Sequence, residues 1–358
     1  MAIKRNKVKV DLTSYPHYVV MGIPKAGKTE LMFNLAKQEY SLDEMLLIST
    51  GMEQGYKALP DIQYEEVLKF NKKEDSEGNR GFVQVVDDIV KNYKELGIKM
   101  VVIDTLDELI NIGTEQVLLE SRQQTGKHCK SLLDAFNGFN RGRDRLLDLI
   151  MNEIHKLDRL PIAVFIIGHT KFKIKKDGLS GEEFEQLTNN LRSDFFSPVA
   201  NSAQMIVNIT VERDIVDGQQ VGETRYMYFK NNGLIDCGCR FEGLPEKLEL
   251  SAENFMKAFK LGVENSLKKS NVKKDVEEMR NEEIKEQETE AEKVQQEVEE
   301  EQKEDEKVSK KELMAQIKDK AQTKEQRTAL LEYVKNECNK TKVSELTMEE
   351  LEKALTLM

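Results

Sequence analysis

One stretch near the N-terminus most constrains what this chain can fold into. Residues Gly22–Thr29 read Gly-Ile-Pro-Lys-Ala-Gly-Lys-Thr, directly after the apolar run Tyr18–Met21 and before apolar residues at helical spacing. This order of strand, glycine-containing loop and helix is the context in which G-x-x-x-x-G-K-[ST] forms a phosphate-binding P-loop. Gly22 and Gly27 let successive backbone N–H groups turn toward phosphate oxygens, and the helix adds its positive N-terminal end.

The side chains of this loop predict how a nucleoside triphosphate is held. Lys28 is expected to reach the β- and γ-phosphates, and the Thr29 hydroxyl is expected to ligate Mg²⁺. The remaining contacts are expected from the loop and the first turn of the helix. The predicted binding residues are Gly22, Pro24, Lys25, Ala26, Gly27, Lys28, Thr29 and Glu30.

A second apolar run, Met45–Ser49, suits a strand that is buried on both faces of a parallel sheet. Glu53 follows it, at the end of a strand where open α/β sheets bind ligands. We therefore expect Glu53 to orient and deprotonate the attacking water. From position alone, a solvated loop acid is an equally good interpretation.

A third apolar run ends in an acid at Asp104, which is the Walker B pattern. A carboxylate at this strand tip is expected to hold Mg²⁺, directly or through water. A strand that ends in Asp is common by itself, so the assignment depends on the upstream P-loop. Glu108 follows closely and is the second candidate for the catalytic base.

The next buried strand, Pro161–Gly168, leads directly to His169. This position predicts a residue that senses the γ-phosphate, and the alternative is a purely structural histidine. Before this strand, residues 112–130 are expected to form a charged insertion. Residues 132–157 are expected to form one long amphipathic helix, with Phe136 and Phe139 packed in the core.

Lysine and apolar side chains alternate over Lys171–Lys175, Lys176 follows, and Asp177-Gly178 is a turn signal. With Glu183–Glu185 alternating on the return, the pattern predicts a hairpin in which lysines face glutamates. A second interpretation is a mobile loop, about 175–198, that meets single-stranded nucleic acid through phosphate contacts and base stacking. The candidate DNA contacts are Lys175, Lys176, Arg192, Phe195 and Phe196.

Two later apolar segments, Met205–Val211 and Thr224–Phe229, predict strands joined by a turn at Asp217-Gly218. A helix at about 252–262 is expected to close this domain. In an oligomer, basic residues near the strand ends are candidates for fingers that reach a neighbour's γ-phosphate. These candidates are Lys230 and Arg240.

The net charge of −11 is concentrated in one segment, because residues 275–306 hold 16 acidic and 4 basic residues. The rest of the chain is close to neutral, so the low isoelectric point does not argue against nucleic-acid binding. The acidic composition predicts a linker over 264–308, disordered or partly helical. Capping-box patterns at Ser309–Glu312, Thr323–Gln326 and Thr347–Glu350 then predict a small three-helix module over 309–358.

These features divide the chain into a P-loop domain over 1–263, the linker and the module. The sequence contains no run of 18 apolar residues, so no membrane span is expected. A cytoplasmic protein is expected, because no apolar signal core follows the basic N-terminus. The four cysteines are scattered, which favours free thiols over a zinc site.

Over about 15–262 the chain resembles the phage-encoded RecA-core ATPases of the Sak-type single-strand annealing class, within the AAA-like phage nucleotide-binding proteins. The segments that carry the resemblance are Gly22–Thr29, Val101–Thr105, Gly168–Lys171 and Cys239–Leu248. The P-loop is generic, so the later segments carry most of the weight. Cys239 stands where that group has a small hydroxyl residue.

The resemblance implies an α/β fold, with a RecA-like P-loop core and a mostly parallel sheet. It implies an ATPase that uses ATP and Mg²⁺ to bind and pair single-stranded DNA with a single-strand-binding protein, as rings or filaments in a bacterial host cytoplasm. By position, Lys28 and Thr29 bind nucleotide and Mg²⁺, Asp104 is the Walker B acid, and Glu53 is favoured over Glu108 as the base. Two alternatives stay open: a helicase- or loader-type DNA motor, and an ATP-switched interaction protein with slow turnover.

Overall fold

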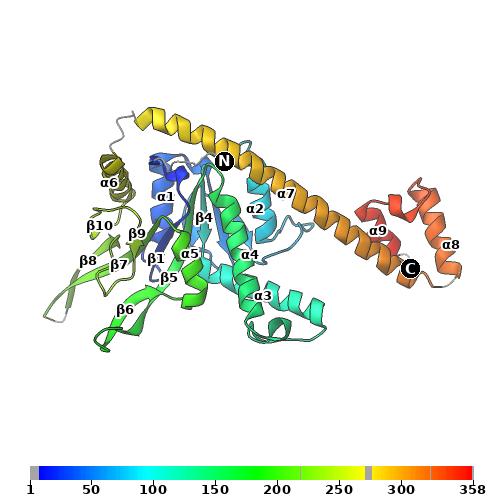
Figure 1. The fold of residues 1–358 in the computed structure, drawn as a ribbon, viewed down its shortest axis with the longest axis horizontal. Helices are drawn as coiled ribbons and strands as arrows, with labels where there is room; N and C mark the ends of the chain where they lie inside the picture. Colours follow the sequence, from blue (N-terminus) through cyan, green and yellow to red (C-terminus); the bar gives the residue numbers. More distant parts are fainter. Residues whose placement is uncertain (1–7, 218, 271–275, 323, 357–358) are drawn as a thin grey trace. The chain divides into compact units, whose positions relative to one another are not determined.

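The computed structural model describes residues 8–217, 219–270, 276–322 and 324–356, and its centre is a mostly parallel sheet (Figure 1). Along the sheet the strand order is β10-β8-β7-β1-β5-β4-β2-β3, with β6 paired to β5 and β9 paired to β7. The strands are β1 (Tyr18–Gly22), β2 (Met45–Thr50), β3 (Gln63–Val67), β4 (Met100–Asp104), β5 (Ala163–Lys176), β6 (Glu183–Asn189), β7 (Met205–Val216), β8 (Gln219–Tyr228), β9 (Gly238–Cys239) and β10 (Lys247–Glu249).

The order and register of the parallel strands bring the predicted site residues to one edge of the sheet. Strand β1 lies between β5 and β7, and β5 separates it from β4. Gly22 is in register with His169, and Asp104 is in register with Ile167. Because the carboxyl ends of parallel strands meet at the same edge, the P-loop, Asp104 and His169 converge there. The predicted α/β fold with a mostly parallel sheet is confirmed.

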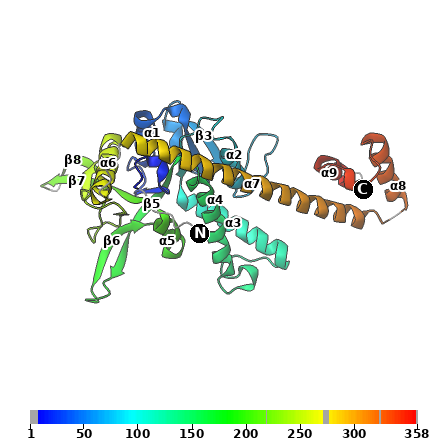
Figure 2. The ribbon, with the colours of Figure 1, turned by 45° about the horizontal axis from the view of Figure 1, so that its top comes forward.

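Helices flank this sheet. Helices α1 and α6 pack on each other against one face (Figures 1 and 2), where Tyr18 stacks on Phe165 with ring centroids 5.0 Å apart. Helix α4 packs against both α2 and α3. The helices are α1 (Lys28–Glu39), α2 (Phe82–Asn92), α3 (Leu106–Thr125), α4 (Arg141–Asp158), α5 (Ser193–Ser202), α6 (Ala252–Ser270), α7 (Val276–Lys320), α8 (Lys324–Glu332) and α9 (Met348–Thr356).

The predicted charged insertion at 112–130 is wrong, because most of it belongs to helix α3. The helix begins directly after Asp104: the Thr105 side chain accepts a hydrogen bond from the Glu108 backbone N–H and caps it. Gly126, with φ of 71°, ends it. Polar residues outnumber apolar ones in this helix, but one face is buried at helical spacing, at Leu106, Leu109, Ile110, Gly113, Val117 and Ser121.

The predicted helix at 132–157 is correct only from Arg141 onward. Five consecutive residues, 136–140, have positive φ, which is incompatible with a right-handed helix. Gly138, with φ of 90°, is among them. Phe139 is 90% exposed, so it is not part of the core as expected.

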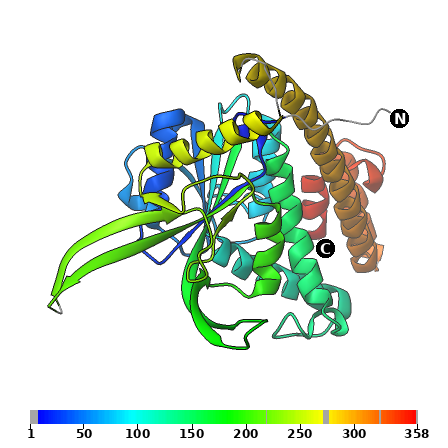
Figure 3. The same cartoon turned by 60° about the vertical axis from the view of Figure 1, so that its left-hand side comes forward.

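Two β-hairpins extend beyond the sheet (Figure 3). The β5–β6 hairpin was predicted, and its register pairs Lys176 with Glu183 as expected. Lys175, however, lies opposite Phe184 rather than an acid. In the β7–β8 hairpin the predicted turn includes Gly218, which lies outside the described residues.

The compact N-terminal unit runs to Val294, beyond the domain end predicted from the sequence at residue 263. Helix α6 continues to Ser270, and the start of α7 is bonded to the N-terminal segment. The Glu283 carboxylate accepts hydrogen bonds from the Val10 backbone N–H at 2.9 Å and from the Ser14 hydroxyl at 2.6 Å. These contacts assign the first part of the predicted acidic linker to the N-terminal unit.

The second unit, Gln295–Met358, has a small core of its own. Its buried side chains come from the end of α7, from the segment after α8 and from α9, and they are Ile317, Tyr333, Val334, Leu346, Leu351 and Ala354. The predicted capping box at Thr347 is formed, because the Thr347 N–H donates to Glu350 and the Glu350 N–H donates to the Thr347 hydroxyl. The helix start predicted at Ser309–Glu312 is wrong, because the backbone of these residues lies inside α7, which runs from Val276 to Lys320. Thr323 lies outside the described residues. None of the described helices has the length and hydropathy that a membrane span requires.

Candidate nucleotide-binding site

The P-loop has the geometry that phosphate binding requires. Gly27 adopts φ of 97° where the loop turns into α1, a conformation that favours glycine. The Lys28 ammonium donates to the carbonyls of Gly22 and Ile23, each at 3.0 Å. Burial lowers the pKa of Lys28, although the nearby Asp104 and Glu53 carboxylates act in the opposite direction. The lysine is therefore held beneath the loop, where an incoming phosphate can take the place of the carbonyls.

Thr29 and Asp104 form the pair that would hold Mg²⁺. The Thr29 hydroxyl donates to Asp104 Oδ2 at 2.9 Å, which joins the start of α1 to the tip of β4. Burial raises the pKa of Asp104 to about 6, and the neighbouring Glu53 adds to the increase. A buried carboxylate and a hydroxyl are the hard oxygen ligands that Mg²⁺ prefers, so these residues fit the metal.

The P-loop, Thr29 and Asp104 line a cavity with a volume of 680 Å³. Glu53 and His169 line the same cavity. Glu53 Oε1 is 3.8 Å from His169 Nε2. Asp107 holds the histidine from the other side, because its Oδ2 accepts from the His169 backbone N–H at 2.9 Å and lies 3.6 Å from Nδ1. Burial alone would raise the pKa of Asp107, but the hydrogen bonds with His169 outweigh it and lower the pKa. An ionised Asp107 thus orients His169 toward the phosphate end of the cavity.

The geometry favours Glu53 over Glu108 as the catalytic base. Glu53 lines the cavity that contains Lys28, Thr29 and Asp104. The Glu108 side chain instead packs close to Gly51, and Glu108 Oε1 accepts from the Asn111 side chain at 3.2 Å.

Replacing Glu53 by Gln should lower the rate of ATP hydrolysis by roughly 10²–10⁴, the usual contribution of a general base. ATP affinity should change little, because the phosphate contacts remain. The matched variant Glu108→Gln should keep the rate within a few-fold. A steady-state ATPase assay combined with equilibrium ATP binding checks both variants, and a larger loss of rate in Glu108→Gln would reverse the assignment.

Replacing Asp104 by Asn should stabilise the nucleotide-free protein at pH 8 while it abolishes hydrolysis. A carboxyl with a pKa near 6 rather than 3.8 is protonated more readily when folded, so stability falls as pH rises between these values. Above pH 6 the ionised group costs about 3 kcal/mol, which Asn avoids. The melting temperature should therefore rise by several degrees at pH 8 and change little at pH 4.

The control for this experiment is Asp148→Asn, which changes an exposed aspartate on α4. It should leave both the melting temperature and the hydrolysis rate unchanged. If Asp104→Asn lowered the melting temperature equally at both pH values, the ionised Asp104 carboxylate would not destabilise the folded protein.

Two residues of the site were not singled out from the sequence as functional. Asp107 follows the Walker B acid by three positions, and its role becomes visible only through its contact with His169. Arg225 comes from β8, where it lies opposite Val211, and it lines the cavity beside Lys25 and Gly27. An alternating strand pattern gives no signal for such a residue, because the register of β8 decides what it approaches.

The candidate DNA contacts are only partly placed as expected. Phe195 and Phe196 are 8% and 7% exposed within α5, so their prediction as base-stacking residues is wrong. Their rings are buried because this segment is a helix with an apolar face rather than a loop. Arg192 is exposed and bonds Asp194. Lys175 and Lys176 are exposed on the β5–β6 hairpin.

The two finger candidates lie away from this chain's own cavity. Strand β8 runs antiparallel to β7, so the residues after Tyr228, including Lys230, lead away from the P-loop edge. The Arg240 backbone N–H bonds the carbonyl of Gln204, at the start of β7 and thus at the opposite edge of the sheet. Their action on a neighbouring subunit stays a prediction.

Four side chains meet at the carboxyl edge of the mostly parallel sheet: the buried P-loop lysine, the Thr–Asp pair and the glutamate that follows β2. Together they define a P-loop nucleotide-binding core. The AAA domain family model matches residues 14–241, which is more than half of the chain. The chain therefore belongs to the AAA domain family, and its nucleotide-binding domain is that of an AAA-like P-loop ATPase. No curated protein matches the chain.

Proposed function

We propose that this protein is an ATPase whose turnover is coupled to single-stranded DNA, which binds along the β5–β6 hairpin. The observation that carries the proposal is the course of β5. One continuous strand, Ala163–Lys176, runs from the centre of the sheet past His169 at the nucleotide cavity into the lysine-bearing arm of the hairpin. Bound nucleotide and bound DNA would therefore both contact residues of the same strand.

One face of the hairpin gathers positive charge. Lys171, Lys173 and Lys175 share this face because side chains alternate along a strand. The pKa of Lys173 is lowered, first by burial and then by the charges of Lys171 and Lys175. Asp236, 3.9 Å from Lys175, offsets part of this repulsion. Phosphate groups would relieve the rest, which makes the face suitable for a DNA backbone.

An aromatic side chain lies on the same face. Phe184 of β6 is directly opposite Lys175 and is 36% exposed. An exposed ring beside basic residues suits base stacking in single-stranded DNA. Phe184 thus takes the role first assigned to the buried Phe195 and Phe196.

The contacts of Asp107 offer a physical link between the two sites. Its Oδ2 accepts from the His169 N–H, and its Oδ1 accepts from the Asn190 side chain at 3.3 Å. The Asn190 backbone N–H also donates to the His169 carbonyl at 2.7 Å, which ties the end of β6 to β5. A change at the γ-phosphate that moves His169 would therefore alter the pairing at the base of the hairpin.

The finer parts of the proposal rest on the resemblance of the sequence to the phage annealing proteins. They are a role in phage recombination in the bacterial host cytoplasm, cooperation with a single-strand-binding protein, and assembly into rings or filaments. In such an assembly Lys230 and Arg240 would act on the ATP of a neighbouring subunit. ATP with Mg²⁺ is the proposed cofactor pair.

The experiment that tests this function is the ATPase rate of the purified full chain, with and without single-stranded DNA. Stimulation by DNA, combined with annealing of complementary strands, supports the proposal. Directional displacement of a strand from a forked duplex would favour a helicase- or loader-type motor. Hydrolysis that is slow and indifferent to DNA would instead favour an ATP-switched interaction protein.

A further inference from the structure

Glu53 does not stand at the tip of β2, so its position depends on the turn that follows the strand. Strand β2 ends at Thr50, and Glu53 comes three residues later. Three extended residues span roughly 10 Å, which is enough to carry a carboxylate into the nucleotide cavity or out of it. A further contact must therefore hold Glu53 where it lines the cavity.

We propose that Ser49 is a positioning residue for Glu53, and that its hydroxyl acts through the backbone of the base rather than on the nucleotide. The Ser49 hydroxyl donates to the Glu53 backbone carbonyl at 2.5 Å. Ser49 is 2% exposed and is not among the residues that line the cavity. This inference rests on the proposed ATP hydrolysis with Glu53 as the base, but it does not depend on DNA.

The hydrogen bond from Ser49 closes the turn from the side of the strand. Ser49 is in register with Asp104, so its hydroxyl is anchored beside the tip of β4. The Glu53 N–H donates to the Thr50 carbonyl at 3.5 Å, as in a β-turn over residues 50–53. With both its N–H and its carbonyl bonded to the strand, the backbone of Glu53 is fixed on either side of its Cα, and this fixes the direction of its side chain.

The other side of the turn is closed by Gly51 and Glu108. The Gly51 N–H donates to the Val67 carbonyl at 2.8 Å, and its φ of 66° favours glycine. A Cβ added to Gly51 would be 2.9 Å from Glu108 Cβ and closer still to the Glu108 carboxylate. A side chain at position 51 would therefore displace either Glu108 or the turn. The isosteric change Glu108→Gln keeps this packing, which agrees with the small effect expected for it.

A competing role for Ser49 is support of Mg²⁺, because Ser49 and Asp104 are neighbours across β2 and β4. A serine hydroxyl has one hydrogen to donate, and in the structure it is directed to the Glu53 carbonyl. The Asp104 carboxylate accepts instead from the Thr29 hydroxyl. The two roles predict different losses. Loss of support for the metal would weaken Mg²⁺ binding, whereas loss of the positioning bond would lower the rate at saturating Mg²⁺.

The test is the hydrolysis rate of the full chain at saturating ATP and Mg²⁺, measured without DNA and with it. Ser49→Ala leaves the Glu53 carbonyl without its donor, so the turn shifts and the rate should fall roughly 10- to 100-fold. The affinity for ATP, measured by calorimetry, and the Mg²⁺ concentration at half-maximal rate should not change. Ser49→Thr retains the hydroxyl and should keep most of the rate.

The double variant with Glu53→Gln separates positioning from a general structural role. If Ser49 acts through the base, Ser49→Ala should lower the rate little further once the base is lost, because residues that act as a unit are not additive. Radiolabelled ATP makes this residual rate measurable. Gly51→Ala strains the turn from outside the strand and should behave like Ser49→Ala in both backgrounds, so the test does not depend on the folding of one variant.

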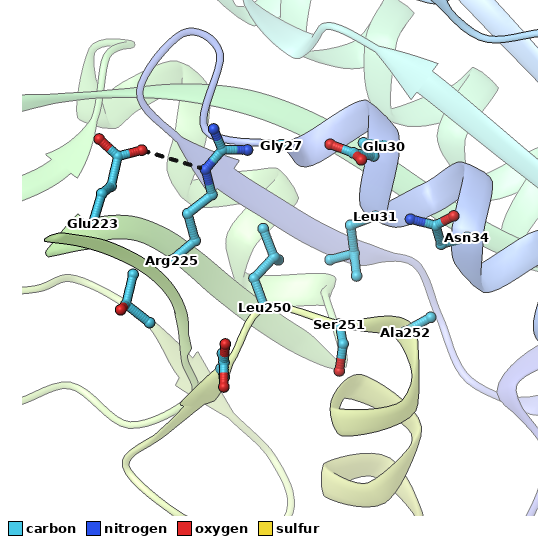
Figure 4. A pocket seen from close by; sticks show the side chains of 11 residues that line it. Gly27, Glu30, Leu31, Asn34, Glu223, Arg225, Leu250, Ser251 and Ala252 are labelled. Carbon is cyan, nitrogen blue, oxygen red and sulfur yellow. Dashed lines mark ion pairs between the residues drawn. The ribbon is translucent and has the colours of Figure 1, made fainter.

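Two other serines provide matched controls. Ser121 is fully buried on α3, and its hydroxyl accepts from the Phe136 N–H at 2.8 Å. Ser251 lines the neighbouring pocket between α1 and β8, where its hydroxyl accepts from the Asn254 N–H at 3.1 Å (Figure 4). Ser121→Ala and Ser251→Ala should each keep the rate at saturating ATP.

Several outcomes would overturn the inference. They are an unaltered rate in Ser49→Ala, a full further loss of rate in the double variant, and a raised requirement for Mg²⁺. Hydrolysis that DNA does not stimulate would contradict the proposed function and leave these comparisons intact. A chain that hydrolyses no ATP, with or without DNA, would overturn both.

Discussion

Replacing Lys28 by Ala is expected to reduce ATP hydrolysis by at least roughly 10²-fold, with or without DNA. The ammonium is buried beneath the P-loop and bonds two loop carbonyls, so it is already positioned where the transferred phosphate develops charge. Electrostatic stabilisation of this kind is strong because the site needs little reorganisation when the reaction occurs. The measurement is the steady-state release of phosphate at saturating Mg²⁺-ATP.

The matched control is Lys37→Ala. Lys37 is an exposed lysine on the same helix, and its ammonium lies 4.5 Å from the centre of the Phe33 ring. It does not line the nucleotide cavity, so the control should hydrolyse ATP at the unaltered rate. Circular dichroism should show that both variants keep their helices and strands. Retention of more than half of the activity in a folded Lys28→Ala protein would mean that hydrolysis does not depend on this loop.

The central part of the fold and the phosphate site could be predicted because their signals are local. The P-loop, Asp104 and His169 each stand at the end of a continuous apolar run, and parallel pairing then brings them together. Glu53 could be placed beside them, but the choice between Glu53 and Glu108 needed the structure. Both acids follow strands, and only the turn of each backbone decides which carboxylate reaches the cavity.

Contacts that depend on register or on a helical face could not be read from the sequence. Arg225 approaches the P-loop because β8 returns antiparallel to β7 and places it opposite Val211. The sequence predicts Phe195 and Phe196 within a mobile loop, yet helix α5 buries both rings. Helix α3 was missed for a related reason: its buried stripe is narrow and its many charges concealed the period.

Replacing Lys171, Lys173 and Lys175 together by Gln is expected to weaken single-stranded DNA binding at least roughly tenfold. Three fewer phosphate contacts should also reduce the slope of log affinity against log salt by about 2. ATP hydrolysis without DNA should persist, because these residues lie beyond the nucleotide cavity. The measurement is a fluorescence titration of labelled DNA at several salt concentrations.

The control carries the same change in net charge at another surface. Lys257, Lys260 and Lys268 are exposed on α6, and their triple Gln variant should keep both the affinity and the salt slope. Within the hairpin, Phe184→Ala should weaken binding, whereas Phe172→Ala removes an exposed ring from the opposite face and should not. If both triple variants lost affinity equally, the binding would reflect overall charge, and the hairpin would not be the DNA site. Equal losses in Phe184→Ala and Phe172→Ala would instead argue that the hairpin binds DNA without one preferred face.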